Sequence, residues 1–133
     1  DGDLQFHSRY YATDFLEPWA EDATQVLAAV QASDESAFWE LLEYYFAEQD
    51  TFEDADVFAE TRPVLSDHGL DAEAILEDAR AQAYDDLVSK NADAAAAAGV
   101  ETVPYFYMFD GTDLVTENGG VTGYNTFRHA LGL

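Results

Sequence analysis

The sequence predicts a single-domain α/β chain, residues 1–133, in which an early strand, a large helical block and a terminal hairpin with a helix follow one another. Three observations lead to this fold class. Apolar and polar residues alternate near the start, as in a half-buried strand. Apolar residues then recur at helical spacing through the middle of the chain. Near the end, two short apolar runs flank the turn sequence DGTD, as in a β-hairpin.

The expected first strand is LQFHSRYY, residues 4–11, which directly follows the turn signal DGD. One side of this strand carries Leu4, Phe6, Ser8 and Tyr10. A connection follows, and Pro18 suits the first position of a helix because the N–H that it lacks is unpaired there in any helix. We therefore expect a helical block over residues 17–98.

Four or five helices are expected within this block, the first in WAEDATQVLAAVQA. Ser33 or Asp34 is expected to cap the second helix. The apolar face of that helix comprises Phe38, Leu41, Leu42, Tyr45 and Phe46. Pro63 is expected to kink or divide the third helix, and Gly69 to end it.

Asp71 is expected to cap a fourth helix, which continues with a bend into the alanine run at residues 94–98. Gly99 is expected to end the helical block. Residues 99–133 then predict two strands and a helix: TVPYFYMF, the turn DGTD, LVTE, a break at NGG, and YNTFRHALGL. Tyr124 and Phe127 are expected on the apolar side of this last helix.

The expected sheet is thin. The run YFYMF is apolar on both alternations, which is typical of a strand covered on both faces, yet only three strands are visible. Another segment or another chain must complete such a sheet, and pairing of two copies through their sheet edges is one expectation. Pro104 stands where a proline is tolerated, at the first position of a strand.

The net charge of the chain indicates which classes of partner it can bind. The chain has 28 Asp and Glu against 5 Lys and Arg, a formal net charge of −23. Nucleic acid and anionic membrane surfaces are therefore excluded as expected partners, because both require clustered cations. Self-repulsion of this size is relieved by salt, so we expect a protein from a halophile, although an acidic protein with a basic partner also fits.

Other site patterns give no candidate. His7, His68 and His129 lack metal-ligand spacing, the acidic clusters lack a calcium-loop pattern, and we expect neither metal nor cofactor. Glu40 and Glu43 are read as surface charge, and no catalytic residue is expected within the chain. Neither a membrane-spanning run nor a signal peptide is visible, and the compartment stays open: cytoplasmic or exported, in high salt.

The segment AAAAAGVETVPYFYMFDGTDLVTENGGVTGYNTFRHAL resembles the C-terminal part of DsbA-like proteins, of the DsbA or FrnE type, in the thioredoxin superfamily. The matching positions are Gly99, Val100, Val103, Pro104, Phe106, Gly111 and the tail from Gly120 to Leu131. The helical block resembles the insertion that these proteins carry. The resemblance thus implies a partial thioredoxin-like fold, with a helical insertion at 17–98 and a ββα portion at 99–133.

The resemblance implies that Pro104 is the cis-proline of that fold and that Val103 precedes it. This loop faces the active-site thiols in such proteins and docks the backbone of a protein or peptide substrate that carries a thiol or a disulfide. The implied activity is thiol–disulfide exchange through a mixed disulfide. Val103 and Pro104 are the only site residues that carry over.

One departure matters for activity: the family needs a C-x-x-C at the start of its first helix, and this chain has no cysteine. We expect an N-terminally truncated oxidoreductase domain that is redox-inactive as it stands. A natural cysteine-free relative that binds peptides or serves assembly is the alternative. An isomerase of the related glutathione-S-transferase kappa group is a third, weaker alternative, because it needs the same missing segment.

Overall fold

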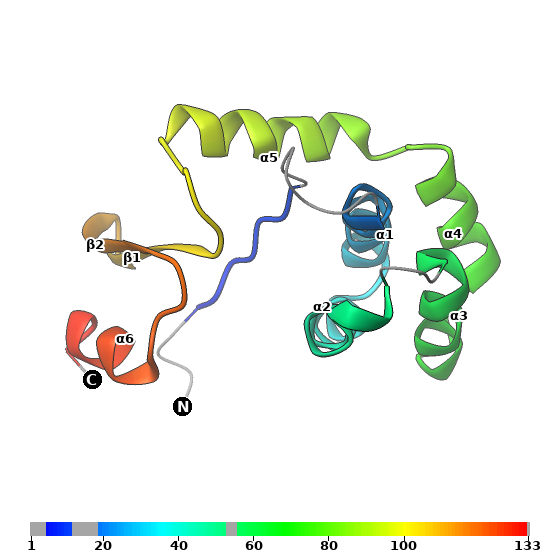
Figure 1. Cartoon of the computed structure of the whole chain (residues 1–133), viewed down its shortest axis with the longest axis horizontal. Helices are drawn as coiled ribbons and strands as arrows, with labels where there is room; N and C mark the ends of the chain where they lie inside the picture. The colour runs from blue at the N-terminus through cyan, green and yellow to red at the C-terminus, as the bar shows by residue number, and fades with distance from the viewer. Residues whose placement is uncertain (1–4, 12–18, 53–55, 133) are drawn as a thin grey trace. The chain divides into compact units, whose positions relative to one another are not determined.

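The computed structural model describes residues 5–11, 19–52 and 56–132. These residues form two compact units, residues 1–93 and 94–133, which are described separately below. Figure 1 labels the elements: α1 (Trp19–Ser33), α2 (Glu35–Ala47), the short 3₁₀ helix η1 (Gln49–Thr51), α3 (Val57–Asp67), α4 (Ala72–Arg80), α5 (Asp85–Ala97), β1 (Tyr105–Asp110), β2 (Asp113–Gly119) and α6 (Tyr124–Ala130). The expected first helical residue, Pro18, lies outside the described residues.

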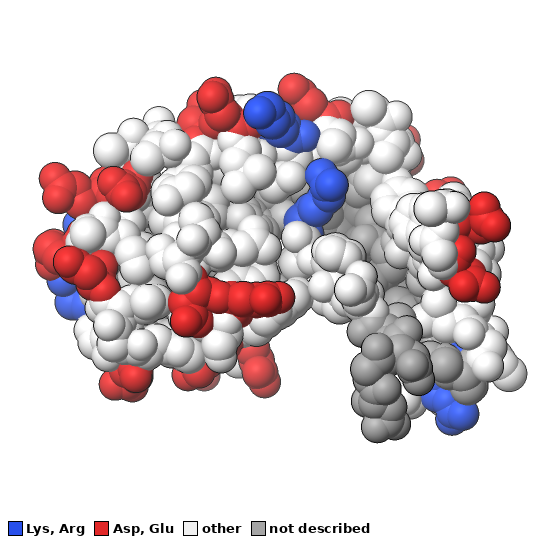
Figure 2. Space-filling view, turned by 180° about the vertical axis from the view of Figure 1, so that it is seen from behind, with Lys and Arg blue, Asp and Glu red and all other residues white. Residues whose placement is uncertain are grey.

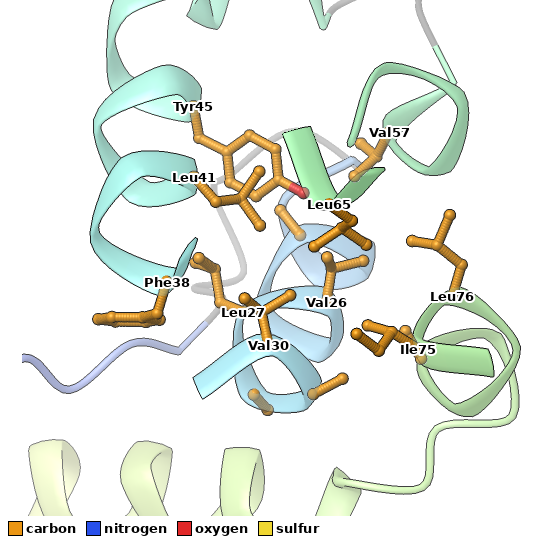
Figure 3. Packing of buried hydrophobic residues seen from close by; sticks show 14 of the residues in the cluster. Val26, Leu27, Val30, Phe38, Leu41, Tyr45, Val57, Leu65, Ile75 and Leu76 are labelled. Carbon is orange, nitrogen blue, oxygen red and sulfur yellow. The ribbon is translucent and has the colours of Figure 1, made fainter. Parts of the chain in front are cut away.

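Helix α1 lies at the centre of the first unit. Nine of its residues between Ala20 and Val30 are buried, and most of these are alanines or other apolar residues. In Figure 3, Leu27 points toward Phe38 and Leu41 of α2, and Val26 lies on the side of α3 and α4. The small alanine side chains allow helices on both sides of α1 to approach closely, and burial of this core is the main stabilising term of the unit.

Helix starts in this unit follow local chemistry. Asp34 caps α2 with a hydrogen bond from the Ala37 N–H, and Asp71 caps α4 with one from the Ala74 N–H, as predicted. Asp56 caps α3 in the same way, which the sequence reading had not singled out.

Of the two effects predicted for Pro63, a kink or a division of the third helix, the division is wrong, since α3 runs through Pro63 from Val57 to Asp67. Proline removes the bond to the carbonyl of residue 59. Ala59 and Pro63 are both exposed, so water can satisfy that carbonyl.

The predicted early strand is also wrong within its described part, because residues 5–11 form no strand. A strand exists only where a neighbouring strand accepts its hydrogen bonds, and the described residues offer none here. The segment packs on helices instead. Tyr10 is buried against Phe38, its hydroxyl donates to Gln31 Oε1 at 2.9 Å, and its carbonyl accepts from Asn91 Nδ2 at 3.1 Å.

The second unit contains an antiparallel hairpin of β1 and β2 followed by α6. Tyr105 lies opposite Gly119 and Met108 opposite Thr116, and the register then shifts by one residue so that Phe109 faces Leu114. This bulge leaves Val115 unopposed. Gly111 opens the two-residue turn with a φ of +58°, a conformation that other residues rarely adopt.

Helix α6 packs on one face of the hairpin through Phe127, whose ring meets Phe106 edge to face with centroids 4.9 Å apart. Tyr124, expected on the apolar side of this helix, is instead 75% exposed. The α/β class is confirmed, a mostly helical chain with a two-stranded antiparallel sheet in the described residues in place of the three strands expected.

Candidate functional site

The two residues singled out from the sequence, Val103 and Pro104, lie in the loop that leads from α5 into β1. The peptide bond between them is cis. Val103 is 41% exposed although it is apolar, and Pro104 is exposed as well. These two residues therefore present an apolar surface at the start of a strand.

The flank of this loop is held in place by the end of β2. The Pro104 carbonyl accepts a hydrogen bond of 2.8 Å from the Gly120 N–H, which extends the hairpin ladder by one pair. Thr122 Oγ1 accepts a hydrogen bond from the Asn118 side chain and donates to the Gly120 carbonyl at 3.1 Å. These contacts tie residues 118–122 together directly beside Pro104.

Gly119 explains how close the two chain segments come. A Cβ at this position would lie 2.9 Å from Thr102 Cγ2 and 3.1 Å from the Tyr105 ring. The sequence pattern predicts NGG only as a break after a strand. The need for glycine at 119 arises from a contact with a residue 17 positions away, and no local pattern predicts it.

The backbone N–H and C=O groups of Val103 bear on what the loop can bind. Within the described part of the chain, neither its N–H nor its C=O takes part in a backbone hydrogen bond outside the regular elements, whereas the Pro104 carbonyl beside it does. An exposed donor and acceptor on one residue, next to an anchored strand, can pair with an extended polypeptide. Val103 can therefore bind the backbone of a polypeptide through its main-chain groups.

Two tyrosines, Tyr105 and Tyr107, follow the loop directly. Burial raises the pKa of the Tyr105 phenol, and the neighbouring Glu117 carboxylate raises it further. The Tyr107 hydroxyl donates to the Ala98 carbonyl at 3.4 Å. The pKa of Tyr105 is thus moved away from neutral pH, where a general acid or base works best.

The histidines are not brought together. His68 ends α3, and its Nε2 lies 2.8 Å from Glu40 Oε2, whereas His7 and His129 are exposed. Among the described residues, no cluster of three or more His, Asp or Glu side chains could hold a metal ion.

One apolar cavity of about 130 Å³ lies in the first unit, between α1 and α2. Its lining residues are Tyr10, Trp19, Ala20, Ala23, Thr24, Leu27, Leu42, Tyr45, Phe46 and Gln49. The hydroxyls in this lining are bound within the protein: Tyr10 to Gln31, Thr24 to the Glu21 carbonyl and Tyr45 to Thr61. The cavity contains neither Val103 nor Pro104 and offers no catalytic group.

The surface is dominated by carboxylates. Figure 2 shows Asp and Glu spread over the visible face, with few Lys and Arg side chains among them. Among the described residues, two carboxylates lie beside a basic side chain, Glu73 beside Arg62 and Glu40 beside His68, while the net charge of the chain is −23. No described helix combines the length and apolar character needed to cross a membrane.

Comparison with known proteins addresses the family directly. The model of the DSBA-like thioredoxin domain matches residues 3–132, which is nearly the whole chain. Comparisons with curated proteins and with solved structures gave no significant match. The match covers both the helical unit and the hairpin unit with its Val103–Pro104 loop. The chain therefore belongs to the family of DSBA-like thioredoxin domains.

Proposed function

We propose that residues 1–133 are the polypeptide-docking part of a DsbA-like thiol–disulfide oxidoreductase domain, and that Val103 and Pro104 dock the substrate. The observation that carries this proposal is the exposed Val103, whose backbone groups have no backbone partner among the described residues, beside the anchored Pro104 carbonyl. An extended substrate pairs with this backbone as a short additional strand would. Because main-chain groups make this pairing, binding depends mainly on an extended substrate backbone and little on the sequence of the substrate.

The chain itself supplies no sulfur. Thiol–disulfide exchange begins when a thiolate attacks one sulfur of a disulfide, forms a mixed disulfide and releases the other sulfur as a thiolate. None of the 133 residues is a cysteine, so the attacking thiolate must come from outside them. In an insulin-reduction assay with dithiothreitol, we expect the chain alone to give the rate of the reagent blank, and turnover above that blank refutes this part of the proposal.

A cysteine-free binding module is the second candidate, favoured by the zero cysteine count together with the open loop. The two candidates differ in what accompanies these residues in the cell. An intact mass above 14.7 kDa with two titratable thiols in the protein from its native source supports the oxidoreductase. A mass of 14.7 kDa without thiols supports the binding module.

Docking is tested with an unfolded partner that lacks thiols, S-carbamidomethylated ribonuclease A, whose basic character suits an acidic protein. Val103→Pro removes the N–H that pairs with the substrate, whereas Val103→Ala keeps it and serves as the matched control. In amide NMR spectra recorded in 1 M KCl, we expect the wild type and Val103→Ala to show shifts at residues 102, 103 and 105. Val103→Pro should bind at least about fivefold more weakly, the loss expected for one backbone hydrogen bond.

Two results contradict the docking proposal. One is equal affinity of Val103→Pro and Val103→Ala, provided that circular dichroism finds both variants folded. The other is a set of shifts confined to the helical unit, for instance around the cavity between α1 and α2. Neither result bears on the redox prediction, which depends on the cysteine count alone.

We also propose that the acidic surface adapts this protein to molar salt, as in a halophile. The support is the imbalance of 28 acidic against 5 basic residues, a formal net charge of −23. At 1 M salt the screening length falls to roughly 3 Å, which is shorter than the spacing of most surface carboxylates.

A further inference from the structure

Pro104 and Gly120 form an incomplete backbone pair. Tyr105 lies opposite Gly119, so Gly120 follows in the same register opposite Pro104. In a hydrogen-bonded antiparallel pair, each residue donates its N–H to the carbonyl of the other. Gly120 donates to the Pro104 carbonyl at 2.8 Å. Proline has no N–H, so the reciprocal bond to the Gly120 carbonyl cannot form.

The Gly120 carbonyl has a different donor, the hydroxyl of Thr122, whose Oγ1 lies 3.1 Å from it. Strand β2 ends at Gly119, and Gly120 has a φ of +85°, a conformation that other residues rarely adopt. Gly120 and Thr122 are both half-buried. A carbonyl that is removed from water without a partner costs free energy, so the Thr122 hydroxyl offsets the donor that is missing from Pro104.

The hydroxyl of Thr122 is oriented by Asn118. A carbonyl only accepts, so the single hydroxyl proton of Thr122 is used in the bond to Gly120. Thr122 Oγ1 can then only accept from a second partner, and Asn118 Nδ2 donates to it. The side-chain amide of Asn118 therefore directs the hydroxyl proton toward the Gly120 carbonyl.

We propose that Thr122, oriented by Asn118, supplies the donor that Pro104 lacks, and that these two side chains are positioning residues for the Val103–Pro104 loop. They hold the Gly120 carbonyl, while the N–H of the same residue anchors the Pro104 carbonyl. Because Pro104 follows Val103 directly, the anchor also sets where the Val103 backbone lies. This inference rests on the docking role proposed for the loop, and neither side chain has to touch the substrate.

The contacts are tested first on the chain without any partner, in 1 M KCl. The through-bond NMR coupling between the Gly120 nitrogen and the Pro104 carbonyl carbon reports on the anchor, as does amide exchange of Gly120. Thr122→Val keeps the shape of the side chain and removes the hydroxyl. We expect it to reduce the coupling and to accelerate Gly120 exchange at least about fivefold, the effect of one hydrogen bond. Thr122→Ser keeps the hydroxyl and should retain both wild-type values.

Asn118→Asp tests the direction of the hydrogen bonds. The carboxylate cannot donate to Thr122 Oγ1, so the hydroxyl proton should turn toward it and leave the Gly120 carbonyl without a donor. We expect the same changes in coupling and exchange as for Thr122→Val. Val121→Asp adds the same charge at a side chain that is 97% exposed, and it should change neither quantity.

Binding of S-carbamidomethylated ribonuclease A then tests the positioning role. Thr122→Val should bind at least about threefold more weakly than Thr122→Ser, and Asn118→Asp at least about threefold more weakly than Val121→Asp. Circular dichroism should find all four variants folded. A merely structural contact would lower stability without separating each variant from its control in this assay.

Two outcomes overturn the proposal. An unchanged coupling between Gly120 and Pro104 in both Thr122→Val and Asn118→Asp means that the anchor stands without these side chains. A reduced coupling with undiminished binding means that the contacts stabilise the chain but do not position the loop. A wild type that shows no binding at the loop contradicts the docking proposal, and the positioning role falls with it. The coupling measured without a partner then still decides whether Thr122 supplies the missing donor.

Discussion

Gly119 and Thr102 lie so close together that position 119 has no room for a side chain: a Cβ there would come within 2.9 Å of Thr102 Cγ2. This contact joins the end of β2 to the loop that contains Val103. The backbone of Gly119 is not in the left-handed region, so the requirement is one of space and not of conformation. The substitution of either residue therefore tests how firmly the loop is held.

Gly119→Ala should destabilise the chain by about 1–3 kcal/mol, the usual cost of an extra methyl group in a packed contact. Thr102→Ser removes Cγ2 at an exposed position and alone should cost less than about 0.5 kcal/mol. In the Thr102→Ser background, Gly119→Ala should lose part of its penalty, while the Tyr105 ring at 3.1 Å maintains the rest. Denaturant unfolding of all four proteins measures this coupling, and strictly additive effects would contradict the contact.

Asn91 is the one buried residue described on α5, and its side-chain amide donates to the Tyr10 carbonyl. Asn91→Ala leaves that carbonyl without its partner and should lower the free energy of unfolding by about 1–3 kcal/mol. Lys90→Ala, on the exposed side of the same helix, is the matched control and should change stability by less than about 0.5 kcal/mol. Equal effects of the two substitutions in urea unfolding would mean that the Asn91–Tyr10 bond contributes nothing.

Alkaline pH should unfold the helical unit. Burial, with a smaller contribution from Tyr84, raises the pKa of Tyr10 to about 12, and burial raises the pKa of Tyr45 above its usual value as well. Above about pH 10 the unfolded chain loses these phenolic protons while the native chain keeps them. The native state then binds more protons, so stability is fully present below pH 10 and falls by about 1.4 kcal/mol per pH unit for each tyrosine above it.

Urea unfolding at pH 9, 10 and 11 at constant salt measures this slope. Tyr10→Phe and Tyr45→Phe each remove one titrating group and should each flatten the dependence. A slope that survives both substitutions would assign the alkaline sensitivity to other groups.

Salt should stabilise the chain chiefly by screening. The midpoint of thermal unfolding should rise steeply between 0.1 and 1 M KCl, as the screening length falls from about 10 Å to about 3 Å. A variant with four exposed carboxylates replaced by amides, Glu43→Gln, Glu77→Gln, Asp78→Asn and Asp93→Asn, keeps all described helix caps and should gain less over this range. Equal gains would point to a general salting-out effect of KCl in place of charge screening.

Helices were predictable because their signals are local. The capping positions of Asp34 and Asp71, the stop at Gly99 and the hairpin turn at Gly111 depend on residues within a few positions of each other. Alternation at residues 4–11 is also a local signal, yet it does not form a strand. A strand needs a partner, and here packing of Tyr10 on the helices and its link to Asn91 satisfy the segment in another way.

The candidate site was predictable only in part. Val103 and Pro104 came from the resemblance to DsbA-like proteins, and the sequence pattern alone gave no more than a proline at the start of a strand. The exposure of Val103, the bond between Gly120 and the Pro104 carbonyl, and the tight contact of Gly119 with Thr102 all join segments separated along the chain. Contacts of this kind follow from the fold and leave no periodic trace in the sequence.

The central position of α1 has a consequence for synthesis on the ribosome. Val26 and Val30 leave the ribosome before Ile75 and Leu76, which help to cover them and follow roughly 45 residues later, after a few seconds at ordinary rates of elongation. During that interval the helix with the most buried residues in the unit is not fully covered. The acidic residues of α1 itself, Glu21 and Asp22, give the nascent chain a charge that opposes aggregation until its partners arrive.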